Sequence, residues 1–279
     1  MAEWQTGEVE TNGVTIHYTR TGGNGPVVVL AHGVTDNGLC WSPLARELEN
    51  DYDLIMVDAR GHGASEGPAG RYGPDVQAED LAGLITALGL EKPAVLGHSM
   101  GAGTALALAG AHPDLVGAIL LEDPPAWWTE WQASPEAQEM VAGMKSRAGN
   151  YKTLTRDEIV EAGREGHPDW SDAELQPWAD SKIAFSPNVL VVFEPGNRAN
   201  VDWPATLGAI TVPTLLIMAD AERGGIITEE SAASLKALVP QTEVAYIPGA
   251  GHNVRREQFG PYIEVVREFL KANATTPAA

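Results

Sequence analysis

Hydrophobic positions along the chain occur in two patterns that alternate. Short continuous apolar runs are typical of strands buried on both faces of a parallel sheet, and longer stretches with apolar residues at helical spacing are typical of the helices that cover it. This pattern predicts strands over residues 26–31, 53–57, 92–96, 116–121, 214–218 and 243–247. It predicts helices over residues 72–88, 102–111, 229–238 and 261–271. The pattern predicts an α/β fold.

Two further strands, at the beginning of the chain, are predicted from a turn signal. Residues 6–10 and 14–19 flank Asn12 and Gly13, a pair that favours a two-residue hairpin turn. We therefore expect an antiparallel pair with an architectural role at the beginning of the chain.

The alternation stops between residues 124 and 204, a stretch too long for an ordinary connection. This stretch has helical patterns and contains six of the eight tryptophans. We expect residues 1–123 and 205–273 to form the core, residues 124–204 to form a helical lid, and residues 274–279 to be a disordered tail.

Charge and composition exclude several functions. A net charge of −20 repels nucleic-acid backbones and anionic membranes. The single cysteine, Cys40, cannot form an internal disulfide, and no Cys/His spacing resembles a zinc site. The polar N-terminus lacks the features of a signal peptide. We expect a cytoplasmic monomer or homodimer without a metal or another cofactor, and no nucleic-acid or membrane partner.

Ser99 is the predicted nucleophile. It lies in the pentapeptide Gly97-His98-Ser99-Met100-Gly101, which is weak evidence alone but here follows a predicted strand and precedes a predicted helix. In that setting a sharp turn exposes the hydroxyl, and the helix N-terminus stabilises negative charge.

Two backbone N–H groups are the predicted oxyanion donors. The first belongs to Met100, directly after the nucleophile. The second is expected in the loop His32-Gly33-Val34, which follows the strand over residues 26–31, and we assign it to Val34.

His252 is the predicted general base. It lies in a glycine-rich loop between the last predicted strand and the last predicted helix, from which its side chain can reach Ser99. Neutral imidazole suits this role near neutral pH. The other histidines are predicted to be structural.

Together these motifs resemble those of the α/β-hydrolase family. The matching positions are His32-Gly33, Asp58-X-Arg60-Gly61-X-Gly63-X-Ser65, Gly97-X-Ser99-X-Gly101 and Gly251-His252, in that family's order. The resemblance implies an eight-stranded, mostly parallel sheet with the lid inserted after the sixth strand, and a Ser/acid/His triad whose acid follows the strand before the last. It also implies structural roles for Asp58 and Arg60.

The acid has three candidates. Glu222 lies where the family's aspartate is usually found, counted from Pro213, whereas Asp220 has the usual residue type and lies closer to the strand. We favour Glu222 over Asp220. Asp123 is the third candidate because some relatives take the acid from that loop, although a structural role at the entry to the lid is the simpler interpretation.

The tryptophan-rich lid suggests a small apolar substrate. Its predicted contacts are Trp41, Trp127, Trp128, Trp131 and Met140. The resemblance implies hydrolysis of a carboxylic ester, thioester or lactone, and acyl-homoserine lactones fit the expected pocket. Carbon–carbon bond hydrolysis, cofactor-free perhydrolysis and a ligand-binding pseudoenzyme remain alternatives.

Overall fold

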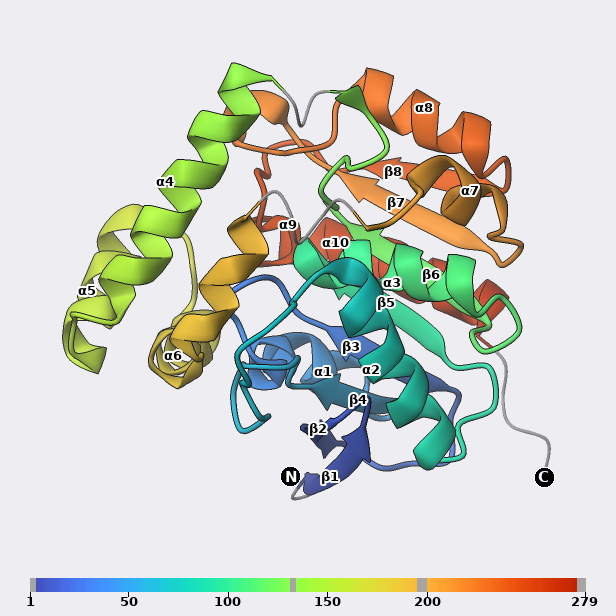
Figure 1. The fold of residues 1–279 in the computed structure, drawn as a ribbon, viewed down its shortest axis with the longest axis horizontal. Helices are drawn as coiled ribbons and strands as arrows, with labels where there is room; N and C mark the ends of the chain where they lie inside the picture. Colours follow the sequence, from blue (N-terminus) through green and yellow to red (C-terminus); the bar gives the residue numbers. More distant parts are fainter. Residues whose placement is uncertain (1–3, 131–133, 195–199, 275–279) are drawn as a thin grey trace.

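One eight-stranded sheet organises the computed structural model, which describes residues 4–130, 134–194 and 200–274 (Figure 1). The strand order is β1-β2-β4-β3-β5-β6-β7-β8, and all pairs are parallel except β1 with β2 and β2 with β4. The strands are β1 (Gln5–Thr11), β2 (Val14–Arg20), β3 (Val27–Ala31), β4 (Asp53–Val57), β5 (Ala94–His98), β6 (Ala118–Glu122), β7 (Thr214–Met218) and β8 (Thr242–Tyr246). The predicted eight-stranded, mostly parallel sheet is confirmed.

The predicted hairpin joins β1 and β2. Asn12 and Gly13 have φ values of 47° and 74°, the left-handed geometry that a tight two-residue turn requires. The turn pairs Thr11 with Val14, so the two turn residues, Asn12 and Gly13, set the register of the hairpin.

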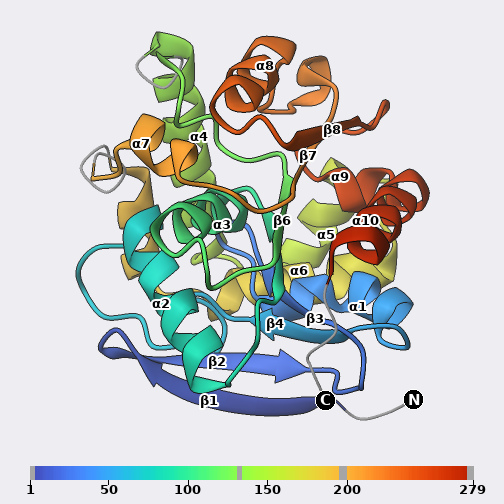
Figure 2. The ribbon, with the colours of Figure 1, turned by 90° about the vertical axis from the view of Figure 1, so that its right-hand side faces the viewer.

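Helices cover both faces of the sheet (Figure 2). The helices α2 (Pro74–Ala87), α3 (Met100–Ala111), α7 (Trp203–Gly208) and α8 (Glu229–Leu238) contribute to one apolar cluster, whereas α1 (Ser42–Leu48), α9 (Val254–Glu257) and α10 (Phe259–Asn273) contribute to the other. This arrangement explains the continuous apolar runs, because a strand between two helical layers buries both of its sides.

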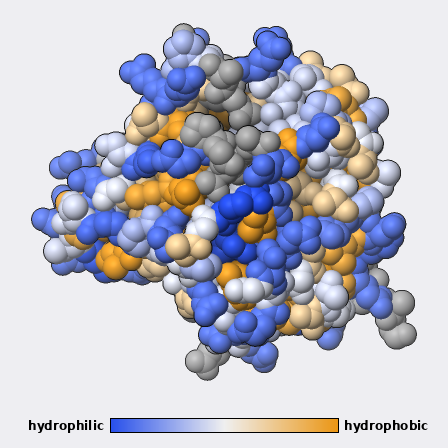
Figure 3. All heavy atoms as spheres, in the orientation of Figure 1, coloured by the Kyte–Doolittle hydropathy of each residue, from blue (hydrophilic) through white to orange (hydrophobic). Residues whose placement is uncertain are grey.

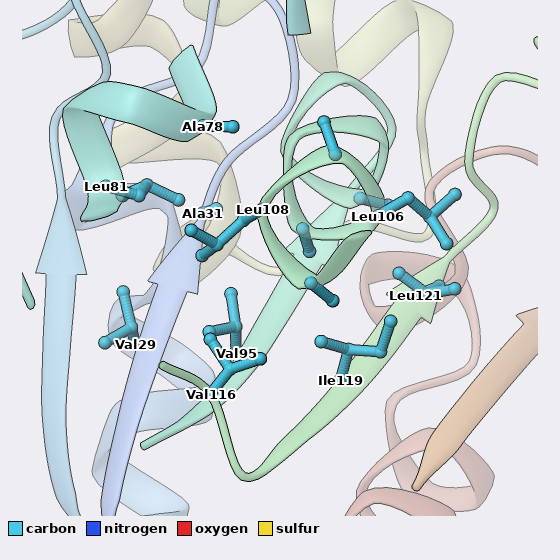
Figure 4. Packing of buried hydrophobic residues seen from close by; sticks show 14 of the residues in the cluster. Val29, Ala31, Ala78, Leu81, Val95, Leu106, Leu108, Val116, Ile119 and Leu121 are labelled. Carbon is cyan, nitrogen blue, oxygen red and sulfur yellow. The ribbon is translucent and has the colours of Figure 1, made fainter. Parts of the chain in front are cut away.

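Alternate strand residues divide between the two clusters. Val29 and Val95 pack on the face covered by α3, and Leu30 and Leu96 pack on the face covered by α1 and α10. Figure 4 shows Val29 and Val95 beside Leu108 of α3, which is fully buried. Truncating a leucine in such a core typically costs 2–5 kcal/mol of unfolding free energy, so this packing holds the strand ends in place.

Between β6 and β7 the chain forms further helices beyond one end of the sheet (Figure 1). They are α4 (Pro135–Tyr151), α5 (Arg156–Gly166), α6 (Asp172–Ala184) and the 3-10 helix η3 (Pro187–Phe193), with α7 leading back to the core. Helix α5 begins at a capping box made by Thr155 and Glu158. A lid function for residues 124–204 stays a prediction, and the predicted tail lies outside the described residues from residue 275 onward.

Hydrophilic residues cover much of the face seen in Figure 3, with hydrophobic patches between them. Among the helices in the described ranges, none combines the length and the apolar character needed to cross a bilayer.

Candidate active site

Ser99 alone forms the turn between β5 and α3, because the strand extends to His98 and the helix begins at Met100. Its backbone has φ 50° and ψ −113°, a strained conformation for a residue with a side chain. A Cβ atom on Gly97 would lie 2.3 Å from the carbonyl oxygen of Gly101, and one on Gly101 would lie 2.1 Å from that of Ala31. Only glycine at both positions allows this turn.

His252 contacts Ser99, the predicted nucleophile, from the loop between β8 and α9. Its Nε2 lies 3.0 Å from Oγ of Ser99. The carbonyl oxygen of His252 accepts a 2.9 Å hydrogen bond from Nε2 of His98, whose Nδ1 is buried and has no partner among the described residues. Burial holds the pKa of His98 well below its ordinary value, so this histidine is neutral and holds the loop of His252.

Asp123 is the carboxylate that contacts His252. It directly follows β6, is fully buried, and its Oδ2 lies 2.6 Å from Nδ1 of His252. The backbone N–H groups of Ile226 and Ile227 donate to the same carboxylate at 2.8–3.0 Å. Three donors therefore surround a buried charge, which is the arrangement that such a charge needs.

The expectation that Glu222 or Asp220 contacts His252 is wrong. Glu222 is exposed in the short helix η5 (Ala221–Arg223). Asp220 instead accepts hydrogen bonds from Gly249 N–H and from the hydroxyl of Tyr246. The loop after β7 bends so that it presents backbone N–H groups to Asp123 and not a side chain to His252.

Burial lowers the pKa of His252, but the hydrogen bond and the negative charge of Asp123 raise it more, so the net pKa lies above the ordinary 6.5. Glu122 and Asp36 act in the same direction. The site therefore favours the protonated imidazole, which is the form that a general base at this position would reach.

The two predicted oxyanion donors flank Ser99. Val34 and Met100 both line the cavity wall beside it. Within the part of the chain that the structure describes, neither N–H group has a hydrogen-bond acceptor. Gly33 permits the close approach of this loop, because a Cβ atom there would lie 2.7 Å from Nδ1 of His98.

Two cavities meet at Ser99. The first, of about 150 Å³, has a mixed wall that includes charged and polar side chains such as His252 and Arg147 beside aromatic ones such as Trp170, and because it contains the charged groups we call it the polar cavity. The second, of about 70 Å³, is mainly apolar and is lined by Met100, Trp127, Met140, Met144 and Ile226, among others. A substrate at Ser99 can therefore extend a polar group one way and an apolar group the other.

The predicted substrate contacts divide between wall and core. Trp127 and Met140 line the apolar cavity. Trp41 does not, because it is fully buried in the cluster around α1 and its ring lies against Arg255. Trp128 packs toward α8 and donates to the carbonyl oxygen of Ser231, so the expectation is wrong for both, whereas Trp131 lies outside the described residues.

Asp36 connects three segments beside the polar cavity. Nζ of Lys182, on α6, lies 2.6 Å from Asp36 and donates also to the carbonyl oxygen of Thr35 at 3.1 Å. Arg256, on α9, donates to Asp36 at 2.9 Å and lies 3.3 Å from Glu174 of α6. Burial alone would raise the pKa of Asp36, but Arg256, Lys182 and Arg255 hold it well below its ordinary value.

The sequence interpretation missed this network. Lys182 lies in α6, whose apolar residues do not gather on one face, and Arg256 lies in α9, which has only four residues. Neither sequence pattern distinguishes a buried cation from a solvated one. The predicted structural roles are simpler: Arg60 pairs with Asp80, and Asp58 accepts from Gly38 N–H and Ala64 N–H. Among the described residues, no group of three or more metal-binding side chains is close enough to hold an ion.

Comparisons with known proteins agree with this fold. A family model described as alpha/beta hydrolase fold matches residues 26–255. N-formylmaleamate deformylase of Pseudomonas putida is 30% identical over 266 residues, which cover 95% of this chain and 96% of that protein. The 2-(acetamidomethylene)succinate hydrolase of Mesorhizobium japonicum is 27% identical over 274 residues, which cover 95% of this chain and 94% of that protein. A crystal structure of E-2-(acetamidomethylene)succinate hydrolase has a TM-score of 0.83 at 23% identity, covering 96% of this chain and all of that one.

Proposed function

Because this chain belongs to the α/β-hydrolase family, we propose that it hydrolyses a carboxylic ester or lactone of a small molecule through an acyl-enzyme on Ser99. The observation that carries the proposal is the continuous relay from Ser99 to His252 and Asp123, with contacts of 3.0 and 2.6 Å. Nucleophile, base and orienting acid in this geometry are the parts that acyl transfer needs.

In the proposed reaction, Oγ of Ser99 attacks the carbonyl carbon while its proton passes to Nε2 of His252. The negative oxygen of the tetrahedral intermediate accepts hydrogen bonds from the N–H groups of Val34 and Met100. Collapse breaks the bond to the leaving oxygen, which takes the proton from His252. Water then gives a proton to Nε2 of His252 and attacks the acyl carbon. The bond from that carbon to Oγ of Ser99 breaks, the acid leaves, and Oγ takes the proton back from His252.

A second candidate reaction is hydrolysis of an amide-type acyl bond. The deformylase and the acetamidomethylene compound's hydrolase bear names that describe such substrates, and the proposed steps differ only in a nitrogen leaving group. Acyl-homoserine lactones contain both an amide and a lactone, so they belong in the same substrate panel.

Two further activities use the same residues. Carbon–carbon bond hydrolysis of a keto acid is one of them, and a relative whose name gives such acids as substrates, 2-hydroxy-6-oxononadienedioate/2-hydroxy-6-oxononatrienedioate hydrolase 2 of Pseudomonas putida, is 27% identical over 267 residues. Cofactor-free perhydrolysis would replace water by hydrogen peroxide in the second half of the reaction. Carbon–carbon bond hydrolysis requires a diketone substrate and perhydrolysis requires hydrogen peroxide. Hydrolysis of an ester or lactone requires neither, so it is tested first.

The test compares the wild-type protein with Ser99→Ala on 4-nitrophenyl esters, acyl-homoserine lactones and matched N-acyl amides. Hydrolysis by the wild type and its loss in Ser99→Ala would support the proposal, and the better of the ester and amide sets would identify the bond. Activity that survives Ser99→Ala would refute the mechanism.

A fluorophosphonate probe separates an enzyme from a ligand-binding pseudoenzyme. An activated Ser99 reacts with the probe, and mass spectrometry locates the adduct. Absence of labelling in a folded wild-type protein would favour the pseudoenzyme. Ser42→Ala, a substitution at the start of α1 away from the site, is the matched control and should label like the wild type.

A further inference from the structure

Three cations line the polar cavity in a chain whose net charge is −20. Among the residues that the structure describes, they are Arg147, Lys182 and Arg256, and the one carboxylate in the same wall is Asp36. An acidic protein that gathers positive charge at its nucleophile creates a local field that attracts anions. The contacts of each cation show which of them remains available to a ligand.

Lys182 and Arg256 are already neutralised. Together with Arg255 they form a buried network with the carboxylates of Asp36, Glu122 and Glu174, at 2.6–3.3 Å. Three positive charges meet three negative charges. Because paired buried charges are costly to separate, neither Lys182 nor Arg256 is free to bind a substrate anion.

Arg147 is the cation that remains. It lies on α4, is exposed, and has no carboxylate partner within the described ranges. Burial raises the pKa of Tyr151 and lowers that of His167, two other residues of the same wall, and the positive charge of Arg147 acts in the lowering direction on both. The polar cavity thus carries one uncompensated positive charge, and that charge belongs to a side chain with five N–H donors.

We propose, resting on the function proposed above, that Arg147 binds a free carboxylate of the substrate. The scissile carbonyl lies at Ser99, the carboxylate-bearing arm occupies the polar cavity, and the other substituent enters the apolar cavity beside Trp127 and Met140. A planar guanidinium matches a carboxylate with two parallel hydrogen bonds. The substrate class is therefore a small acyl compound with an anionic end, and not a wholly apolar ester.

The experiment uses pairs of substrates that differ only in this charge. Mono-(4-nitrophenyl) glutarate and adipate are compared with their methyl esters, with the uncatalysed rates subtracted. We expect the wild type to prefer at least one free acid in kcat/KM. Arg147→Gln should lower kcat/KM for that acid roughly 10- to 100-fold, the range expected for a charge-assisted hydrogen bond, and leave the methyl ester within about twofold. Arg147→Lys should be intermediate.

Lys145→Gln is the matched control. It removes the same charge from the same helix, but Lys145 pairs with Glu194 at the surface and does not line either cavity. It should therefore retain the preference for the acid. Raising the ionic strength should weaken the preference in the wild type and not in Arg147→Gln.

The outcomes separate this inference from the proposed function. If Arg147→Gln lowers acid and methyl ester equally, or if the wild type hydrolyses the methyl esters without preferring an acid, the carboxylate inference fails and the hydrolase proposal stands. If neither ester is cleaved, succinate is tested for slowing fluorophosphonate labelling of Ser99, with succinamide as the neutral control. If succinate slows the labelling of Ser99 and Arg147→Gln abolishes this protection, the inference is supported. If labelling of the wild type is equally fast with succinate and with succinamide, the inference is overturned. A protein that neither cleaves nor labels refutes the proposed function itself.

Discussion

Replacing Asp123 by Asn tests which carboxylate orients His252. In the wild type, Oδ1 accepts from Ile226 N–H at 3.0 Å and from Ile227 N–H at 2.9 Å, while Oδ2 lies 2.6 Å from Nδ1 of His252 and also accepts from Ile226 N–H at 2.8 Å. The asparagine oxygen will take the position of Oδ1, because Ile227 N–H donates to that oxygen alone and a backbone donor cannot reverse its role, whereas His252 can change its tautomer. Its NH₂ group then faces Nδ1 of His252.

In the variant, residue 123 donates to Nδ1 of His252 where it accepted before, and this reversal determines how far kcat falls. An NH₂ group can only donate, so Nδ1 of His252 must be unprotonated and the proton must lie on Nε2. A protonated Nε2 cannot accept the proton of Ser99. The corresponding change of tautomer in a serine protease lowers kcat about 10⁴-fold, equivalent to about 5.4 kcal/mol of transition-state stabilisation, and we expect a similar loss here with little change in KM.

The assay is steady-state hydrolysis of the best substrate from the panel, with circular dichroism to verify the fold. The matched controls are Asp220→Asn and Glu222→Gln, which remove the charges of the two acids first predicted for this role. Both controls should stay within about threefold of the wild type, since neither carboxylate touches His252. A folded Asp123→Asn protein within tenfold of the wild type, or a large loss of kcat in Glu222→Gln, would refute this reasoning.

Two further predictions concern pH and stability. His252 must be neutral to act as a base and its pKa is raised, so kcat/KM for a neutral ester should fall as the pH drops through a midpoint above 6.5, and a midpoint below 6.5 would contradict the described contacts. Lys182→Met should lower the free energy of unfolding in urea by about 3 kcal/mol, the lower end of the range for breaking a buried pair, because Asp36 keeps Arg256. Lys145→Met, which removes only an exposed pair, should cost at most about 1 kcal/mol, and equal losses in the two variants would contradict the assignment of Lys182 to a buried network.

The sheet and the contact between Ser99 and His252 were predictable because their signals are local. Continuous apolar runs identify strands buried on both faces, and glycines on both sides of Ser99 indicate the sharp turn. The order of Ser99 and His252 along the chain, each after a strand, was enough to bring them to one edge of a parallel sheet. The contact between Ser99 and His252 therefore follows from the order of strands and helices, which the hydrophobic pattern already predicted.

The acid was not predictable in the same way. Asp123, Asp220 and Glu222 all lie just after strands that end at the same edge, so sequence position could not rank them. The path of the loop from residue 220 to Ile227 decides the matter, because it turns its N–H groups inward toward Asp123. That path depends on long-range contacts and has no signature in the local sequence.

Trp41 shows a second limit of local patterns. A tryptophan shortly after a predicted oxyanion loop suggests a pocket wall, yet the apolar face of α1 packs on the sheet and draws Trp41 into the core. Burial of a large ring is favourable wherever helix packing permits it. Which aromatic residues face a cavity is therefore settled by the packing of whole helices.

The buried network at Asp36 divides the inserted helices into a fixed part and a variable part. Helix α6 is tied by Lys182 to the loop that carries Val34 and by Glu174 to helix α9, which follows His252, so a change there also changes the proposed catalytic groups. Helix α4 contributes Met140 to the apolar cavity, Arg147 to the polar cavity and Met144 to both, and its ion pair with Glu194, directly after η3, lies at the surface. Substrate preference can thus be redesigned, or diverge in evolution, by replacing residues of one helix while the reaction chemistry is left intact.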